Sequence, residues 1–354
     1  MGSRILSVSL GEPRGYKGHS LAQPGVTVVL RLLQGDRLPR YSASGNRVLS
    51  NRRRPPPPSL QLRSRASTCT GQQDRIRAAL YRRRDFMKYL REIDFARHLA
   101  SKAGDNALRL QISGMSAEKK ADDSLITRAD TSNEAMMRDL IGTHFPTDGI
   151  IGEEGGSTPG TSGRRWILDP LDGTLDYVRG GRFWSVLIAL EEADDAVLGV
   201  AHCPALAETY WAVRNGGSYC NEKQLHVSSV DVISSAVFSP SGLFADALRP
   251  HSVELMDLMC QFASIRNAGG ALSAGMLAAG QIDVWLKGKA AVWDIAALQV
   301  IIEEAGGRYF ALDGSRSIYA GSAVACTPGL EATVRKFLRL PLPGQYWSYC
   351  LLPD

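Results

Sequence analysis

The 354-residue sequence lacks any apolar run that approaches the roughly 18 residues of a membrane-spanning helix, so no membrane partner is expected. It has only six cysteines and no CxxC pair, which disfavours a zinc site and favours a reduced, intracellular protein. None of its six histidines stands at metal-ligand spacing, so we assign them no catalytic role. With 44% hydrophobic residues, the chain is long enough for one or two globular domains with a sizeable core.

Acidic residues are scarce in the first quarter of the chain. Residues 1–86 contain 4 Asp and Glu against 17 Lys and Arg, whereas residues 87–354 contain 32 against 24, so the net charge of +5 averages two unlike parts. Residues 51–67 combine an arginine run with four prolines, which supports neither helix nor sheet. We therefore predict a basic, Arg/Pro/Ser-rich extension at 1–86, a folded domain at 87–340 and a tail at 341–354.

Three interpretations of the extension stay open. A disordered or non-native segment is favoured, because Met87 opens the first clean helix pattern and a start codon assigned too early would explain the unlike composition. Many Arg and Ser with few acids are also compatible with an organelle transit peptide. A nucleic-acid arm is disfavoured, since the interleaved aromatics of a base-stacking surface are missing. We expect a cytoplasmic protein, or a chloroplast or mitochondrial one if the extension is a transit peptide.

From Met87 onward, the hydrophobic pattern alternates between helical and strand periods. Apolar residues at helical spacing predict helices at 87–110, 131–145, 271–280 and 292–307. Thr131 and Ser132 are the expected N-caps of the second helix. Short apolar or alternating runs predict strands at 148–154, 164–170, 183–192, 196–214, 217–228 and 281–288. Helices mixed with runs of strands indicate an α+β fold rather than a repeating βαβ unit.

Acidic residues stand at the ends of several of these apolar elements. They are Asp130, the pair Glu153-Glu154, Asp169, Asp172 and Asp294. Isolated charges at such places are costly to desolvate, and carboxylates placed together repel each other. A shared divalent cation removes both costs. Oxygen ligands without His or Cys select Mg²⁺, Mn²⁺ or Ca²⁺, so we predict a hard-metal site.

Gly173 and Thr174 follow directly after Asp172 and add an anion site to the predicted metal site. The glycine lets backbone N–H groups approach an anion, and a helix that begins here favours negative charge at its N-terminus. The hydroxyl of Thr174 is placed to orient a water molecule. Metal ions beside an anion cradle suit in-line attack of water on a phosphate ester.

Each acidic motif also has an ordinary structural interpretation. The DPxDG pattern at Asp169 is a common turn signature, and Glu153-Glu154 fits a solvated loop. Asp294 and Asp130 each fit a cap at the start of a helix. Four such motifs, each at an element boundary, together favour the catalytic interpretation.

The motifs "LITRAD", "IGEEGG", "DPLDGT" and "WDIAALQVIIEEAGG" resemble those of the inositol monophosphatase family, and they occur in the family's order over about residues 88–338. This family belongs, with fructose-1,6-bisphosphatase, to a superfamily of metal-dependent, lithium-sensitive phosphatases. The resemblance implies a layered αβαβα sandwich, often a homodimer, that hydrolyses small phosphomonoesters with Mg²⁺. It implies no phosphoenzyme.

The resemblance also implies a role for each matched residue. The implied metal ligands are Glu153, Asp169, the carbonyl of Leu171, Asp172 and Asp294, with Glu153 also placing the attacking water. Gly173 and Thr174 would bind phosphate through backbone N–H groups, and Thr174 would pair with Asp130 to activate water. The implied substrate-side residues are Gly269, Gly270 and Lys287.

The substrate is less sharply implied than the chemistry. Lys287 stands where relatives commonly carry a glutamate that accepts hydrogen bonds from substrate hydroxyls, and a lysine attracts anions instead. Inositol monophosphate is the first expectation as the family's default, and L-histidinol phosphate is the alternative. A nucleotide or sugar phosphatase and an inactive metal-binding relative are the remaining alternatives.

Overall fold

The computed structural model describes residues 87–114, 117–120, 124–243 and 252–339. The expected extension at 1–86 and the tail at 341–354 lie outside the described residues, so the three segment boundaries stay predictions. Among the helices of the described ranges, none is both long and apolar enough to cross a membrane.

The larger sheet has eight strands in the order β10-β9-β8-β7-β6-β5-β3-β4. Strands β3 and β5 are parallel, and all other neighbours in this sheet are antiparallel. Alternate residues of β5 (Arg164–Asp172) point to opposite faces of the sheet. Ile167 packs in the hydrophobic core on one face, whereas Trp166 and Leu168 pack in a second core on the other face. In chain order the strands are β3 (Gly149–Gly152), β4 (Gly156–Thr158), β5 (Arg164–Asp172), β6 (Ser185–Glu192), β7 (Asp195–Cys203), β8 (Glu208–Val213), β9 (Gly217–Cys220) and β10 (Lys223–Gln224).

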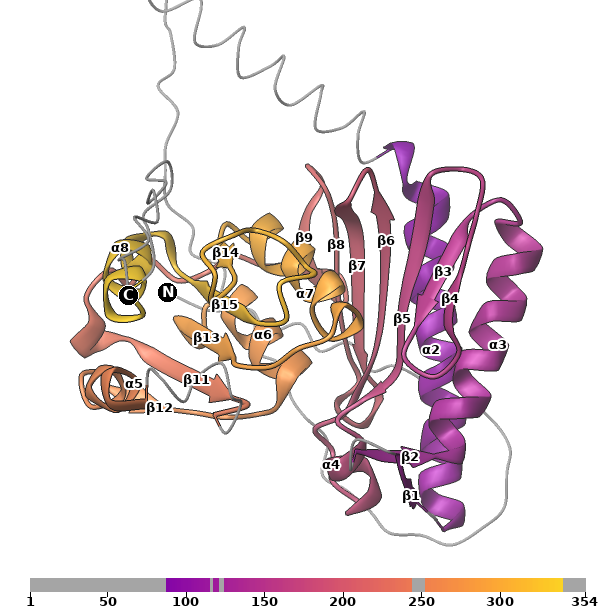
Figure 1. Cartoon of the computed structure of the whole chain (residues 1–354), viewed down its shortest axis with the longest axis horizontal. Coiled ribbons are helices and arrows are strands. Elements are labelled where there is room, and N and C mark those ends of the chain that lie inside the picture. Colours follow the sequence, from indigo (N-terminus) through magenta and orange to yellow (C-terminus); the bar gives the residue numbers. More distant parts are fainter. Residues whose placement is uncertain (1–86, 115–116, 121–123, 244–251, 340–354) are drawn as a thin grey trace, which may run out of the picture. The chain divides into compact units, whose positions relative to one another are not determined.

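Helices α2 (Leu90–Ser113) and α3 (Arg128–His144) cover the outer face of this sheet (Figure 1). The predicted start of the second helix at residue 131 is wrong. The helix begins three residues earlier, because Oγ1 of the extended Thr127 accepts a hydrogen bond from Ala129 N at 3.1 Å and Asp130 Oδ2 accepts one from Thr127 N. Thr131 and Ser132 therefore lie inside α3 and do not cap it.

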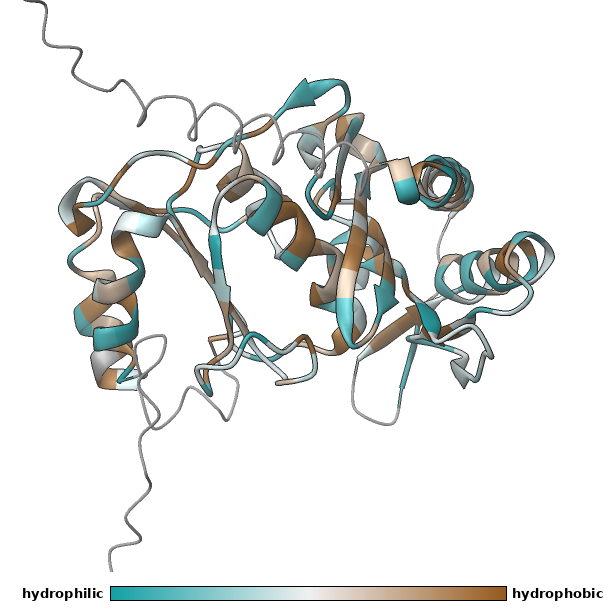
Figure 2. Ribbon diagram, turned by 90° about the horizontal axis from the view of Figure 1, so that it is seen from above, coloured by the Kyte–Doolittle hydropathy of each residue, from teal (hydrophilic) through white to brown (hydrophobic). Residues whose placement is uncertain are grey.

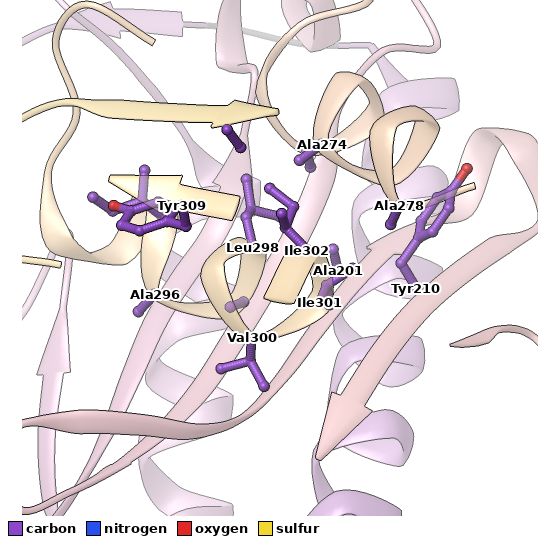
Figure 3. Close-up of a cluster of buried hydrophobic side chains, with 14 of the residues drawn as sticks. Ala201, Tyr210, Ala274, Ala278, Ala296, Leu298, Val300, Ile301, Ile302 and Tyr309 are labelled. Atoms are coloured by element: carbon purple, nitrogen blue, oxygen red, sulfur yellow. The ribbon is translucent and has the colours of Figure 1, made fainter. Parts of the chain in front are cut away.

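Helices α6 (Gly270–Ala278) and α7 (Val292–Glu304) fill the space between the two sheets, as Figures 1 and 3 show. All eight residues from Ile295 to Ile302 are buried, as expected for a helix enclosed on every side. Figure 2 shows the hydrophobic residues concentrated on these central helices and the facing strands. At Gly199 of β7, an added Cβ would collide with the backbone of Ala297, so this glycine permits the close approach of α7.

The second sheet has five strands in the order β12-β11-β13-β15-β14. Its outer face packs on α5 and α8, which completes the layered αβαβα architecture that the resemblance implied. Only β13 of this sheet was expected from the sequence. The elements are β11 (Val237–Ser241), α5 (Ser252–Met259), β12 (Ser264–Ile265), β13 (Val284–Lys287), β14 (Arg308–Phe310), β15 (Ala323–Cys326) and α8 (Glu331–Phe337). The smaller elements are β1 (Ala117–Lys119), β2 (Leu125–Thr127), α4 (Thr174–Val178) and 3-10 turns at Pro204–Leu206, Ile233–Ser235 and Pro328–Leu330.

Candidate active site

Three of the acidic side chains singled out in the sequence converge in the structure. Asp169, Asp172 and Asp294 each present a carboxylate oxygen, and these oxygens lie within 4.8 Å of one another. Asp169 shares the inner face of β5 with Ile167, but residues three apart in a regular strand point to opposite faces. The pairing of β5 with β6 is irregular between Asp169 and Asp172, which lets both carboxylates join one cluster.

Asp169 is the most buried member of this cluster, with 1% of its surface exposed. Its Oδ1 accepts a hydrogen bond from Leu171 N at 2.9 Å. Burial raises the pKa of Asp169 well above its usual range, and the charges of Glu153, Asp172 and Asp294 add to the effect. No ion pair to Asp169 occurs within the described part of the chain, so its charge lacks a direct counter-ion from those residues.

The donor chemistry of the cluster fits the hard cation that the sequence predicted. It offers carboxylate oxygens only, and no His or Cys belongs to the group. Such donors suit Mg²⁺, Mn²⁺ or Ca²⁺, and a divalent cation offsets the mutual repulsion of the three acids.

Asp294 combines two roles that the sequence analysis treated as alternatives. Its Oδ2 accepts a hydrogen bond from Ala291 N at 2.7 Å, so it does help to cap α7. It also belongs to the acidic cluster. Burial raises the pKa of Asp294, and although nearby Lys287 opposes the shift, the charge of Asp172 contributes to it. Helix capping thus holds a candidate metal ligand in place.

Asp130 and Thr174 also meet, although they are 44 residues apart in the chain. Oδ2 of Asp130 accepts hydrogen bonds from Thr127 N at 2.7 Å and Thr127 Oγ1 at 2.5 Å. Its other oxygen, Oδ1, lies 3.3 Å from Thr174 Oγ1, which is also 3.1 Å from Leu171 O. Burial raises the pKa of Asp130 despite the bonds from Thr127. The threonine hydroxyl is therefore held against a carboxylate of raised proton affinity.

Gly173 fixes the turn between this pair and β5. Its φ of 88° lies in the left-handed region, and an added Cβ would stand 2.8 Å from Phe183 O. Glycine alone meets both conditions without strain. The turn lets α4 begin at Thr174, two residues after Asp172 of the acidic cluster.

Glu153 lies near the cluster but is held differently. Lys120 Nζ is 2.8 Å from Glu153 Oε1 and 2.6 Å from Glu154 Oε1. The sequence left open whether Lys120 is solvated or drawn to the acids, and in the structure it pairs with them. Burial raises the pKa of Glu153 to about 7; Lys120 opposes this shift, and the charges of Glu154 and Asp294 add to it. Glu153 does not share the 4.8 Å group, but its charge reaches Asp169.

Lys287 faces the predicted metal ligands. Its Nζ lies 3.4 Å from Asp294 Oδ1 and 3.8 Å from Asp172 Oδ1. Burial would lower the pKa of Lys287, but attraction to Asp172 and Asp294 outweighs it and raises the pKa. A contact between Lys287 and substrate stays a prediction.

The start of α6 closes the other side of Asp172. Ala271 N lies 3.3 Å from Asp172 Oδ2, and an added Cβ at Gly270 would lie 3.1 Å from the same oxygen. Gly269 has a φ of 84°, which allows the chain to turn into the helix. A hollow of about 200 Å³, which includes open solvent, lies beside Asp172 and is lined in part by Trp184 and Gly270.

Residues 90–339 match the family model described as the inositol monophosphatase family. The chain belongs to the inositol monophosphatase family. It is 39% identical to the histidinol-phosphatase of Mycobacterium tuberculosis over 60% of this chain and 84% of that protein. It is 34% identical to the histidinol-phosphatase of Streptomyces coelicolor over 71% of this chain and 97% of that protein. Among solved structures it is similar to an IMPase of Thermotoga maritima, with a TM-score of 0.64, 28% identity and coverage of 71% and 97% of the two chains.

These comparisons confirm the predicted family and its layered fold. Membership of the inositol monophosphatase family also confirms the predicted enzyme class, a phosphoric monoester hydrolase. The individual site residues stay predictions that the geometry supports.

Sequence reasoning missed two residues that hold the site together. Ser185 Oγ lies 3.3 Å from Asp172 Oδ2, and Thr127 anchors Asp130. The T-x-x-D spacing of Thr127 and Asp130 was a usable capping-box signal. For Ser185 no such signal exists, because its place follows from the pairing of β6 with β5.

Proposed function

We propose that the chain is a Mg²⁺-dependent phosphomonoesterase whose substrate is L-histidinol phosphate. The observation that carries this choice is the 39% identity to a relative named histidinol-phosphatase. The cluster of Asp169, Asp172 and Asp294 supports the dependence on a divalent cation. This proposal reverses the order of the two substrates expected from the sequence, where inositol monophosphate came first.

The candidate ligands are Asp169, Asp172 and Asp294, with Glu153 and the carbonyl of Leu171 beside them. A bound divalent cation supplies positive charge that stabilises the charge developing on the phosphate oxygens. The short acidic side chains are already oriented by backbone N–H groups, so the carboxylates themselves need little reorganisation to receive the cation.

The chain's own residues perform the remaining steps. Backbone N–H groups of Gly173 and Thr174 bind phosphate oxygens at the start of α4. Thr174 Oγ accepts a hydrogen bond from the attacking water, and Asp130 accepts the proton that the threonine hydroxyl passes on. Because burial raises the pKa of Asp130, this carboxylate is a better base than an exposed one. The water oxygen bonds to phosphorus, the ester bond breaks, and the departing alcohol takes a proton from solvent.

Inositol monophosphate is the second candidate. The family description and the IMPase of Thermotoga maritima favour it. The position of Lys287 does not separate the two candidates, because its ammonium offers no acceptor to a hydroxyl of inositol monophosphate and repels the protonated amino group of L-histidinol phosphate.

The test is a panel of phosphate esters ranked by kcat/KM. The full chain is assayed with L-histidinol phosphate, inositol 1-phosphate, adenosine monophosphate and fructose 1,6-bisphosphate, in Mg²⁺ and in EDTA. We expect at least about tenfold preference for L-histidinol phosphate and loss of turnover in EDTA. A higher kcat/KM for any other ester overturns the substrate, and folded protein without metal-dependent turnover favours the inactive relative. The homodimer and the compartment stay predictions.

A further inference from the structure

The ammonium of Lys287 stands among the carboxylates that the proposed function assigns to a metal. It lies 3.4 Å from Asp294 Oδ1 and 3.8 Å from Asp172 Oδ1. Only 14% of its side chain is exposed, against 13% for Asp172 and 21% for Asp294. All three groups are therefore largely shielded from water, and the lysine charge acts on the acids with little screening.

The backbone holds Lys287 in this position. The residue ends β13, the central strand of the second sheet, and is paired with Ser241 of β11 and Ala323 of β15. Two positions earlier, Trp285 packs in the core between the sheets, so strand alternation points Lys287 into the same layer. That layer also contains Asp294 at the start of α7.

The start of α6 leaves room for the ammonium. An added Cβ at Gly270 would lie 3.3 Å from Lys287 Nζ and 3.1 Å from Asp172 Oδ2. A larger residue at Gly270 would thus crowd both partners of this ion pair. The chain contributes a lysine from one sheet, an acid from the other, and a glycine that permits their approach.

We propose that Lys287 is an internal counter-ion that competes with a divalent cation for Asp172 and Asp294. The inference rests on the proposed metal site. Carboxylate oxygens coordinate Mg²⁺ at roughly 2.1 Å, so a cation on these oxygens would lie close to the ammonium and be repelled by it. The position at Asp172 and Asp294 therefore fills only when the ammonium moves away. Lys287 thus weakens the binding of a divalent cation at Asp172 and Asp294.

Mn²⁺ titration of the metal-free full chain, without substrate, tests this inference. Isothermal calorimetry gives the dissociation constants, and electron paramagnetic resonance counts the free Mn²⁺. The variants are Lys287→Met and Lys287→Gln, which remove the charge, and Lys287→Arg, which retains it. Lys289→Met is the matched control, because Lys289 is exposed two residues away on the same segment. We expect both neutral variants to tighten Mn²⁺ binding at Asp172 and Asp294 by at least about tenfold, whereas Lys287→Arg and Lys289→Met stay within about twofold.

The inference is overturned if the neutral variants bind Mn²⁺ no more tightly than the unmodified chain, or if Lys289→Met tightens binding equally. Thermal unfolding in EDTA and in Mn²⁺ covers the case in which the metal-free variant is unstable. There we expect a larger rise in Tm on adding Mn²⁺ for Lys287→Met than for the unmodified chain, and an equal or smaller rise also overturns the inference. If the neutral variants bind Mn²⁺ more tightly but the unmodified chain hydrolyses no ester, the proposed function alone is rejected. If the unmodified chain hydrolyses esters but the neutral variants bind Mn²⁺ with unchanged affinity, this inference alone is rejected.

Discussion

The two groups of carboxylates at the site are held in different ways. Asp169, Asp172 and Asp294 have short side chains, and each accepts a hydrogen bond from a backbone amide, that of Leu171, Ala271 and Ala291 respectively. The group of Glu153 and Glu154 has longer side chains, and the contact that joins them is the ammonium of Lys120. The first group is fixed by the core elements β5 and α7, whereas Lys120 comes directly after β1 of a small hairpin.

This difference separates fixed from adjustable ligands. Side chains oriented by backbone amides have little freedom to lose when a cation binds, so they provide most of a preorganised site. A long carboxylate paired with a lysine must break that pair before it turns to a metal. We therefore expect substitutions in the first group to change turnover most, and substitutions in the second group to change it least.

The largest effect is expected for Asp172→Asn. The amide keeps the shape of the side chain but removes a negative charge from the cluster. Since altering a residue that only supports a ligand costs about 10–100-fold, loss of a ligand should lower kcat by more than about 100-fold. Steady-state kinetics at saturating Mg²⁺ measures the effect, with circular dichroism to verify folding.

Asp176→Asn is the matched control for this substitution, because Asp176 is exposed and lies four residues away. We expect it to retain kcat within about twofold. Near-normal turnover of Asp172→Asn would contradict the assignment of Asp172 as a metal ligand.

The next largest effect is expected at the pair formed by Thr174 and Asp130. Thr174→Val removes the hydroxyl that lies 3.3 Å from Asp130 Oδ1 but keeps a branched side chain. Positioned proton transfer contributes about 10²–10⁴-fold to rates, so kcat should fall by about 100-fold. Thr174→Ser retains the hydroxyl and should stay within about tenfold of the unmodified chain. A loss in Thr174→Ser as large as that in Thr174→Val would contradict this role of the hydroxyl.

Much of this site was predictable from the sequence because its residues mark the ends of strong hydrophobic patterns. Asp169 and Asp172 end a buried strand, and Asp294 begins an apolar helix, so their positions along the chain indicated convergence. The second sheet was mostly missed, because strands such as β14 and β12 have only three and two residues. Such short runs carry too little periodicity to be separated from loops.

The position of Lys287 could not be read from the sequence. Its role depends on which sheet faces which, since β13 and β5 belong to different sheets and lie more than 100 residues apart in the chain. The predicted start of α3 was wrong for a more local reason. Thr127 caps the helix by side-chain hydrogen bonds, so the helix begins before Thr131 and Ser132, the N-caps expected from the sequence.

A smaller effect is expected on the free energy of unfolding, which should depend on pH because Glu153 titrates. In the metal-free chain its pKa is raised to about 7 from the ordinary 4.5, chiefly by burial. Between these two values the folded chain binds more protons than the unfolded chain, so the free energy of unfolding falls as pH rises. Glu153→Gln should flatten this decline between pH 5 and pH 7. Urea unfolding in EDTA at several pH values measures it, and an unchanged slope would show that Glu153 is ionised in the folded chain.

The smallest effect on kcat is expected for Lys120→Met. This substitution breaks the ion pairs with Glu153 and Glu154 but keeps a side chain of similar length. Lys120 is about one-fifth exposed and Glu154 about one-tenth, so loss of the ammonium leaves two largely shielded carboxylates without their counter-ion and should lower Tm. Without the ammonium, Glu153 is free to turn to a cation. We therefore expect kcat to be retained and the half-saturating Mg²⁺ concentration to stay within about threefold of that of the unmodified chain. Lys119→Met is the control on the exposed neighbour in β1. A loss of kcat as large as that of Asp172→Asn would mean that Lys120 takes part in the reaction and that the two carboxylate groups form a single unit.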